Sequence, residues 1–346
     1  MQPHMQQKFF LSLSIASTFR NSQPDGENAD DKAQTSAPNP KTPLPPVGSA
    51  QPDFHKVAYV EWGDPQGEHI ICVHGLARNA RDFDPLAERL SRRACVVCPD
   101  IVGRGRSDWL RDPDVFFGYT YAQYMSDITA LIARLGADQV DWVGTSLGGL
   151  LGMMMAAAPR SPVRRLVMND VGPQVPVGLW DVLLGYLASE QVFGSPDDLR
   201  QFIQDHYCGV DKFGVLTEAQ LRHMTKYSER KLSDGKVGLA FDHEVMRFPK
   251  WMQDNNQLKV LKWWDVWKRV RCPVLVLRGE NSGALEMETA ERMRKEGPRA
   301  CVVTIPGCGH APSLMSDAQI TLVDTWLKTM EIDRKSVEAL GASLQS

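Results

Sequence analysis

The sequence predicts an α/β fold, with a mainly parallel, doubly wound sheet and a mostly helical lid over one edge of it. The first observation is an alternation: from Phe54 onward, short apolar runs typical of strands alternate with longer runs of helical periodicity. This order is typical of a parallel sheet with helices on both faces. The second observation is an interruption, because the patterns between Asp170 and Cys272 are helical and no strand of the main sheet is expected there.

The elements of the sheet follow in order along the chain. The expected strands are 57–61, 69–74, 94–100, 139–144, 165–169, 273–278 and 300–305. The expected helices are 83–90, 121–135, 147–158, 284–295 and 317–330. Helix 121–135 is the best delimited, because Thr120 and Gln123 have the spacing of a capping box and Gly136 follows its last turn.

Residues 172–267 are the expected lid. Helical patterns cover 179–190, 197–207 and 218–231, with Pro196 and Thr217 marking two of the starts, whereas 233–248 looks extended around Asp234 and Gly235. Open α/β sheets bind ligands at the carboxyl ends of their strands, so a lid inserted there would cover the substrate site.

The two ends of the chain are expected to lie outside the folded domain. Residues 1–53 are predicted to be a disordered extension, because Pro, Ser, Asp, Asn and Gln dominate 21–52. The core is then 54–171 and 268–332, and 333–346 is a C-terminal tail. The apolar run 9–16 resembles the core of a secretion signal, but it is short and contains serines. We therefore expect a cytoplasmic protein, with export as the alternative.

Composition argues against several classes of partner. A net charge of −3 with mixed signs gives no electrostatic reason to expect nucleic acid. No apolar run is long enough to cross a bilayer, so integral membrane contact is not expected. The seven cysteines, several of them in strand-like runs (Cys72, Cys95, Cys98, Cys272 and Cys301), are expected to be reduced core thiols, and no metal site is expected. The oligomeric state stays open.

The most informative segment is the pentapeptide Gly144-Thr145-Ser146-Leu147-Gly148, which stands between an expected strand and an expected helix. A chain that turns this sharply needs small residues two before and two after the serine, and Gly144 and Gly148 meet that need. Ser146 would then be exposed at the helix N-terminus as a nucleophile, and the backbone N–H of Leu147 would face an oxyanion formed there.

A serine nucleophile needs a general base, and His310 is the candidate. It follows the last expected strand in a glycine-rich loop, Gly307-Cys308-Gly309-His310. His74 competes with it, but it is followed by Gly75 directly after an apolar strand. It more readily shapes a loop at the edge of the substrate site, whose Leu76 backbone N–H would be the second oxyanion donor.

Four motifs occur together in the chain: His74-Gly75-Leu76, Gly103-Arg104-Gly105-Arg106-Ser107, Gly144-Thr145-Ser146-Leu147-Gly148-Gly149 and Gly309-His310-Ala311-Pro312. Over roughly 54–330 the chain resembles the α/β-hydrolase superfamily, and within it the branch of carboxylesterases, enol-lactonases and carbon–carbon bond hydrolases. The resemblance implies a lid inserted after the sixth strand of the sheet. It also implies hydrolysis without a cofactor.

The third member of the catalytic triad departs from that pattern. The family's acid usually follows the next-to-last strand, where Ser282 and Gly283 stand here and cannot carry a charge. Asp170, at the end of the strand 165–169, is the preferred replacement, and Glu280 and Glu286 are the alternatives. A carboxylate is needed there to orient the histidine and stabilise its protonated form.

The leading prediction is a serine hydrolase that cleaves a small carboxylic ester or lactone. Trp180, on the first lid helix, is expected to line its acyl pocket, together with His74 and Gly75 at the edge of the substrate site. Two alternatives stay open: a carbon–carbon bond hydrolase acting on a ketone or dienoate, and a ligand-binding protein without activity, which the absent acid would favour.

Overall fold

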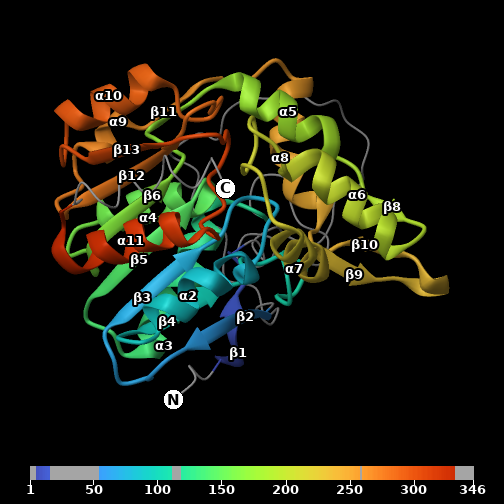
Figure 1. Cartoon of the computed structure of the whole chain (residues 1–346), viewed down its shortest axis with the longest axis horizontal. Helices are drawn as coiled ribbons and strands as arrows, with labels where there is room; N and C mark the ends of the chain where they lie inside the picture. Colours follow the sequence, from blue (N-terminus) through green and yellow to red (C-terminus); the bar gives the residue numbers. More distant parts are fainter. Residues whose placement is uncertain (1–4, 16–53, 111–117, 258, 332–346) are drawn as a thin grey trace, which may run out of the picture.

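The computed structural model describes residues 5–15, 54–110, 118–257 and 259–331 (Figure 1). An 8-stranded sheet forms its centre, with the order β1-β2-β4-β3-β5-β6-β12-β13. The strands from β4 to β13 run parallel, whereas β2 is antiparallel to both of its neighbours. Their bounds are β1 Met5–Leu13, β2 Phe54–Trp62, β3 His69–Val73, β4 Cys95–Pro99, β5 Val140–Thr145, β6 Val163–Asn169, β12 Val274–Gly279 and β13 Cys301–Ile305. The predicted mainly parallel sheet is confirmed.

Helices cover both faces of this sheet. On one face lie α3 (Tyr121–Leu135), α4 (Leu147–Ala156) and α10 (Met287–Lys295), and on the other α2 (Asp84–Leu90) and α11 (Asp317–Thr329). Successive side chains of β3 point to opposite faces of the sheet. Ile71 and Val73 pack with α3 and α4, whereas Ile70 and Cys72 pack with α2 and α11. This burial on both faces explains why the strands are apolar throughout.

The predicted boundary of α3 is confirmed at both ends. The Thr120 side chain accepts the backbone N–H of Gln123, and Gly136 ends the helix with a φ of 64°. The Gln123 side chain does not complete a capping box, because its Oε1 accepts the backbone N–H of Ile15 and its Nε2 donates to the carbonyl of Leu13.

The lid lies to one side of the sheet, above the carboxyl ends of its strands (Figure 1). Its helices are α5 (Val177–Leu187), α6 (Pro196–Tyr207), α7 (Glu218–Ser228) and α8 (Arg247–Asp254), and η3 (His243–Met246) precedes α8. A 3-stranded sheet joins β8 (Val192–Phe193), β10 (Val237–Leu239) and β9 (Glu229–Lys231). β7 (Gln174–Val175) pairs with β11 (Leu261–Lys262), and α9 (Trp264–Trp267) leads back to the core. The helix predicted to reach residue 231 is wrong at its end, because its last three residues pair with β10.

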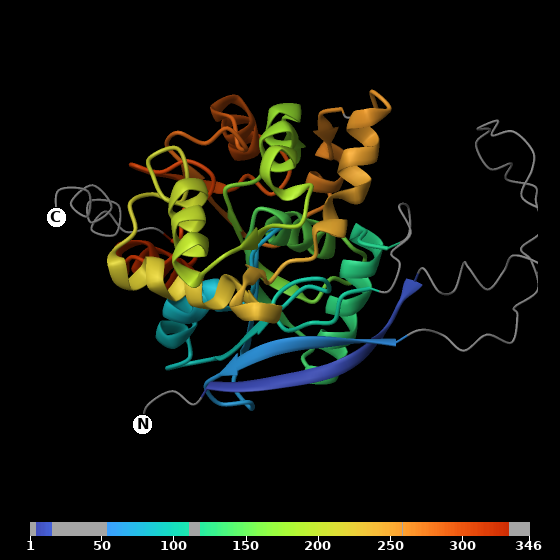
Figure 2. The ribbon, with the colours of Figure 1, turned by 90° about the vertical axis from the view of Figure 1, so that its right-hand side faces the viewer.

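The prediction of a disordered extension is wrong for its first part. Residues Met5–Leu13 form β1, which pairs along its whole length with β2 and makes one edge of the sheet (Figure 2). The physical reason is an alternation within the apolar run: Phe10 and Ser12 are buried, while Phe9 and Leu11 face outward. Residues 16–53 and the predicted tail 333–346 lie outside the described residues.

A second buried interaction holds β1 in place. Ser12 Oγ donates to Asp127 Oδ1 of α3 at 2.6 Å, and the His55 ring of β2 lies 3.1 Å from the same carboxylate. The N-terminal strand is therefore attached to α3 as well as to β2.

Two further predictions concern the membrane and the thiols. Within the described residues, no helix has the length and hydropathy needed to span a bilayer. The seven cysteines are free thiols, and Cys72, Cys95, Cys98 and Cys308 are buried. Cys301 is exposed at the start of β13, so the prediction of a core position is wrong for that residue.

Candidate active site

Ser146 stands on a tight turn between β5 and α4, with φ 51° and ψ −113°. The two glycines around it are required by space: a Cβ on Gly144 would lie 2.2 Å from the Gly148 carbonyl oxygen, and one on Gly148 would lie 1.9 Å from the Val73 carbonyl oxygen. The indole Nε1 of Trp142 donates to the carbonyl of Gly148 at 3.0 Å and fixes the start of α4. The turn therefore holds the serine in the strained geometry that the pentapeptide predicts.

His310 lies next to this serine, on the loop that follows β13. Its Nε2 is 2.9 Å from Ser146 Oγ, and its Nδ1 is 2.8 Å from Asp170 Oδ2. Because an ionised carboxylate can only accept, Nδ1 carries the proton and Nε2 is free to take the proton of the serine hydroxyl. The residues predicted as nucleophile, base and orienting acid are thus connected by hydrogen bonds.

The loop that carries His310 is held from two sides. On the core side, Asn169 Nδ2 donates to the Pro312 carbonyl at 2.8 Å. On the lid side, the backbone N–H of Gly309 donates to the carbonyl of Lys212 at 2.6 Å. A Cβ on Gly309 would lie 2.2 Å from the carbonyl oxygen of Asp211, so only glycine permits this approach. Asn169 and the lid contact are positioning features that the sequence analysis missed.

Asp170 directly follows β6 and is completely buried. Its carboxylate accepts the backbone N–H of Gly279 at 2.8 Å and the hydroxyl of Ser282 at 2.6 Å, besides the ring of His310. Glu280 is exposed, and its side chain accepts the backbone N–H of Gly307 instead. Glu286 is exposed as well, at the start of α10. Among the three carboxylates considered from the sequence, the structure brings Asp170 to the histidine.

Ser282 occupies the position where the sequence pattern favours an acid. Its Oγ accepts the backbone N–H groups of Ala284 and Leu285 at 3.1 and 3.0 Å, which leaves its proton for Asp170. Ser282, which stands in place of the usual acid after β12, therefore donates a hydrogen bond to Asp170, the acid that follows β6. Neither this hydrogen bond nor the one from Gly279 leaves a signal in the sequence alone.

The predicted oxyanion donors flank the serine. Leu76 and Leu147 both line the cavity that contains Ser146, and Leu147 is the first residue of α4. A Cβ on Gly75 would lie 3.7 Å from the Cβ of Ser146, so the Gly75–Leu76 segment runs directly beside the nucleophile. Arg104, fully buried, donates from Nε to the Leu76 carbonyl at 2.8 Å and braces this segment.

His74 does not line the cavity that contains Ser146. Its ring is buried: Nδ1 contacts the Gly75 carbonyl at 2.7 Å, and Nε2 accepts the backbone N–H of Ile101 at 2.9 Å. Burial lowers the pKa of this imidazole to about 3, so the ring is neutral, as its acceptor role requires. The expectation that His74 touches substrate is therefore replaced by a structural role in the loop, and Gly75 too lies outside the set of residues that line the cavity.

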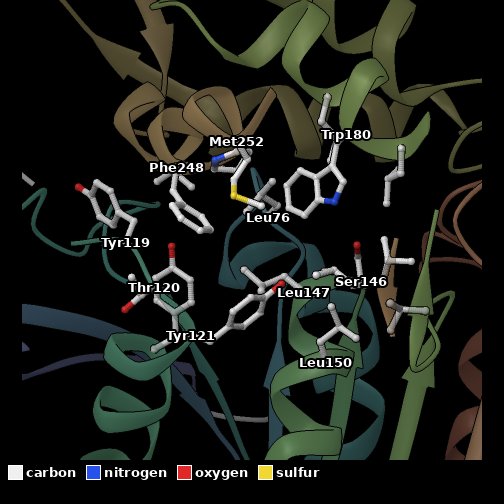
Figure 3. A pocket seen from close by; sticks show the side chains of 18 of the residues that line it. Leu76, Tyr119, Thr120, Tyr121, Ser146, Leu147, Leu150, Trp180, Phe248 and Met252 are labelled. Atoms are coloured by element: carbon white, nitrogen blue, oxygen red, sulfur yellow. The ribbon is translucent and has the colours of Figure 1, made fainter. Parts of the chain in front are cut away.

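The cavity beside Ser146 has a volume of about 160 Å³ and an almost wholly apolar wall. Figure 3 shows Ser146 at one side and Tyr119 at the other, with Trp180 and Met252 on the lid side and Tyr121 on the core side. The wall combines the start of α3, the start of α4 and the lid: Leu76, Tyr119, Thr120, Tyr121, Tyr124, Ser146, Leu147, Leu150, Val171, Val175, Leu179, Trp180, Leu183, Val245, Phe248, Pro249, Met252, Lys259 and Leu261. Trp180 thus lines the cavity beside Ser146, as expected from the sequence. Within the described part of the chain, no group of three or more His, Cys, Asp or Glu side chains could hold a metal ion.

Comparison with known families agrees with this geometry. The family model of the alpha/beta hydrolase fold matches residues 68–315. The chain belongs to the α/β-hydrolase superfamily. The match includes the elbow serine, the loop histidine and the whole lid.

Individual relatives of this α/β-hydrolase are also hydrolases. A 3-hydroxybutyrate-oligomer hydrolase of Cupriavidus necator is 38% identical over 274 residues, which cover 78% of this chain and 92% of the relative. A 2-(acetamidomethylene)succinate hydrolase of Mesorhizobium japonicum is 26% identical over 74% of this chain and 86% of its own. Among solved structures, an alpha/beta hydrolase from Novosphingobium aromaticivorans superposes with a TM-score of 0.68 at 30% identity, covering 79% of this chain and 94% of its own. The protein is therefore an enzyme of the hydrolase class.

Proposed function

We propose that the protein is a serine hydrolase that cleaves a carboxylic ester or lactone through an acyl-enzyme on Ser146. The observation that carries this proposal is the continuous hydrogen-bonded series from Ser146 through His310 to the buried Asp170. The series stands at one side of an apolar cavity. Together these supply a nucleophile, a base, an orienting acid and a dry place for an acyl group.

The reaction follows from the positions of the atoms. Ser146 Oγ attacks the ester carbonyl while its proton passes to His310 Nε2, and Asp170 stabilises the resulting imidazolium. The backbone N–H groups of Leu76 and Leu147 hold the oxyanion of the tetrahedral intermediate. His310 then returns the proton to the oxygen of the leaving alcohol. A water molecule, deprotonated by the same ring, releases the acid from Ser146.

The substrate class we propose is a short ester of a hydroxy acid, such as an oligomer of 3-hydroxybutyrate. Support comes from the Cupriavidus necator relative, which is named for that activity and is covered almost completely. The cavity supports the same size class, because an apolar cavity of roughly 150 Å³ accommodates a group as large as benzene. A short acyl unit fits this space, whereas a long fatty acyl chain would extend beyond it.

The other two readings have less support. Hydrolysis of a carbon–carbon bond in a dienoate needs polar groups that bind the dienoate, and the wall described above is apolar except for a few hydroxyl groups and one lysine. A ligand-binding role without activity was favoured by the absence of an acid after β12. The contact between Asp170 and His310 removes that argument.

Replacement of the nucleophile tests the proposal directly. Ser146→Ala should abolish ester turnover and labelling by a fluorophosphonate probe, while the midpoint of thermal unfolding stays near that of the wild type. The assay is hydrolysis of p-nitrophenyl butyrate together with release of 3-hydroxybutyrate from its dimer. Turnover by the variant above a few per cent of wild type would place the chemistry at another residue.

A further inference from the structure

Lys259 differs from every other residue that lines the cavity. Among the described residues that do so, it is the only one with a full charge. It is exposed, and it lies on the segment between α8 and β11, which belongs to the lid. A long, flexible side chain in this position keeps its charge in water while its methylene groups cover apolar surface.

The described residues that line the rest of the cavity carry no negative charge. None of the described lining residues is a carboxylate, and the first turns of α3 and α4, which both begin at the cavity, contain no acidic residue. The N-terminus of a helix carries a partial positive charge. A substrate that enters therefore meets mostly apolar walls, and among the described lining residues Lys259 is the one cation that it meets.

We propose that Lys259 binds the free terminal carboxylate of an oligoester acid whose scissile carbonyl lies at Ser146. The inference rests on the proposed function and adds to it a subsite for the acid end of the substrate. The apolar wall cannot take a carboxylate without a large desolvation cost, so the acid end must stay at the solvent-exposed lysine while the acyl group fills the cavity.

This arrangement fixes the direction of the substrate. The carboxylate belongs to the alcohol fragment, which leaves when the bond between the acyl carbon and the alcohol oxygen breaks. His310 supplies the proton of the new hydroxyl group, and the lysine forms no bond of its own. Hydrolysis then releases a fragment that carries the free carboxyl end, and a neutral ester of the same length loses the contact with Lys259.

The test compares the 3-hydroxybutyrate dimer and trimer with their methyl esters, which carry a neutral methyl ester in place of the free carboxylate, and it counts only cleavage of the ester bonds between the 3-hydroxybutyrate units. The measured quantity is the ratio of kcat/KM for the free acid to kcat/KM for the methyl ester. For Lys259→Ala this ratio should fall about fivefold, and for Lys259→Glu about tenfold or more, since exposed ion pairs contribute up to about 1 kcal/mol. The lower ratio should come from a higher KM of the variants for the free acid. In the wild type the ratio should also fall at high salt, because exposed charges are screened.

Lys262→Ala is the matched control, because Lys262 is an exposed lysine of the neighbouring strand β11 that does not line the cavity. Its ratio should equal that of the wild type. A ratio unchanged in Lys259→Ala and Lys259→Glu would overturn the inference while leaving the proposed function intact, and so would an equal loss for acid and methyl ester. If the wild type hydrolysed neither substrate but did hydrolyse p-nitrophenyl butyrate, the proposed substrate class would fall together with this inference, and the serine hydrolase would stand.

Discussion

Asp170 shows how a single backbone conformation selects the acid of this site. Its φ of 57° lies in the left-handed region, which Asp and Asn tolerate better than other residues with a side chain. Asn can keep this backbone and most of the volume of the side chain. Exchange of Asp170 for Asn therefore removes the charge and leaves the local fold in place.

We predict a graded series at this carboxylate. Asp170→Asn should lower kcat by at least about a hundredfold with little change in KM, because the imidazolium loses its counter-charge and the ring its tautomer. Ser282→Ala should lower kcat about tenfold, because it removes one of three hydrogen bonds to Asp170. Steady-state kinetics on a short p-nitrophenyl ester measure both.

Glu280→Gln is the control in the same loop and should change kcat less than about twofold, since its exposed carboxylate contacts only the backbone of Gly307 among the described residues. If Glu280→Gln were the crippling change, the acid would be wrongly assigned. If neither Asp170→Asn nor Glu280→Gln mattered, the site would work as a Ser–His dyad.

The sequence predicted the members of the site better than their supports. Ser146 and His310 could be found because a strained turn and a close approach demand glycines at fixed spacings, and glycines are visible in a sequence. Asp170 could be proposed from its place at the end of a strand, but not preferred decisively over Glu280. Ser282 and Asn169 could not be found, because their contacts join residues 112 and 143 positions apart along the chain.

At the scale of secondary structure, α5 is the lid helix that carries Trp180 to the cavity. The helix begins after Pro176, and only Leu184 and Leu187 are fully buried on it. Among its other apolar side chains, Leu179, Trp180 and Leu183 line the cavity, whereas Tyr186 packs against aromatic rings of α6. Figure 3 places the indole of Trp180 between Ser146 and Met252.

Trp180→Ala should change substrate choice more than the reactivity of Ser146. Loss of the indole enlarges the cavity, so the activity ratio of p-nitrophenyl octanoate to p-nitrophenyl butyrate should rise about fivefold or more. Labelling by a small phosphonate should proceed at nearly the wild-type rate, because this side chain takes no part in the hydrogen bonds that join Ser146, His310 and Asp170. Esterase assays across acyl lengths and the labelling rate are the two measurements.

Val182→Ala is the matched control on α5, since Val182 is 63% exposed and does not line the cavity. It should leave the length preference unchanged. Equal losses of turnover and labelling in Trp180→Ala would instead mean that the indole supports the fold of the lid.

The elements that were wrongly predicted share a cause. β1 and β9 lie in sequences whose local preference is ambiguous, and their strand character depends on partners far along the chain. For β1 the alternation of Phe10 and Ser12 with exposed residues was a usable signal, but the polar segment after it favoured disorder. The strands buried on both faces and the amphipathic helices were predictable, because their patterns depend on the sheet alone.

At the scale of the whole molecule, His74 makes stability depend on pH. Its folded pKa of about 3 is below the value of 6.5 expected when unfolded. Above pH 6.5 the ring is neutral in both states and has no effect. As the pH falls below 6.5, His74 becomes protonated in the unfolded state but stays neutral in the folded state. The free energy of unfolding therefore decreases with falling pH until about pH 3, where the folded state is protonated too.

The expected loss from His74 between pH 7 and pH 5 is about 2 kcal/mol, from 1.36 kcal/mol per pKa unit. Urea unfolding of the wild type and His74→Gln at both pH values measures it. The variant should be less stable at pH 7 and should lose about 2 kcal/mol less on acidification. Groups shared by both proteins, such as Asp100 with a pKa raised by burial to about 6, cancel in the difference. Parallel losses in the two proteins would contradict a neutral His74.

The contact between Gly309 and the segment around Asp211 and Lys212 limits how the protein can admit its substrate. This segment supplies the carbonyl that holds the loop of the base, and it approaches that loop so closely that no side chain fits between them. A swing of this part of the lid would break the hydrogen bond at Gly309 and leave the loop held from the core side alone. The stretch from α6 to α7 must therefore keep its position while the catalytic loop is in place. The route by which the substrate enters is accordingly expected on the side of the lid that contains α5 and α8.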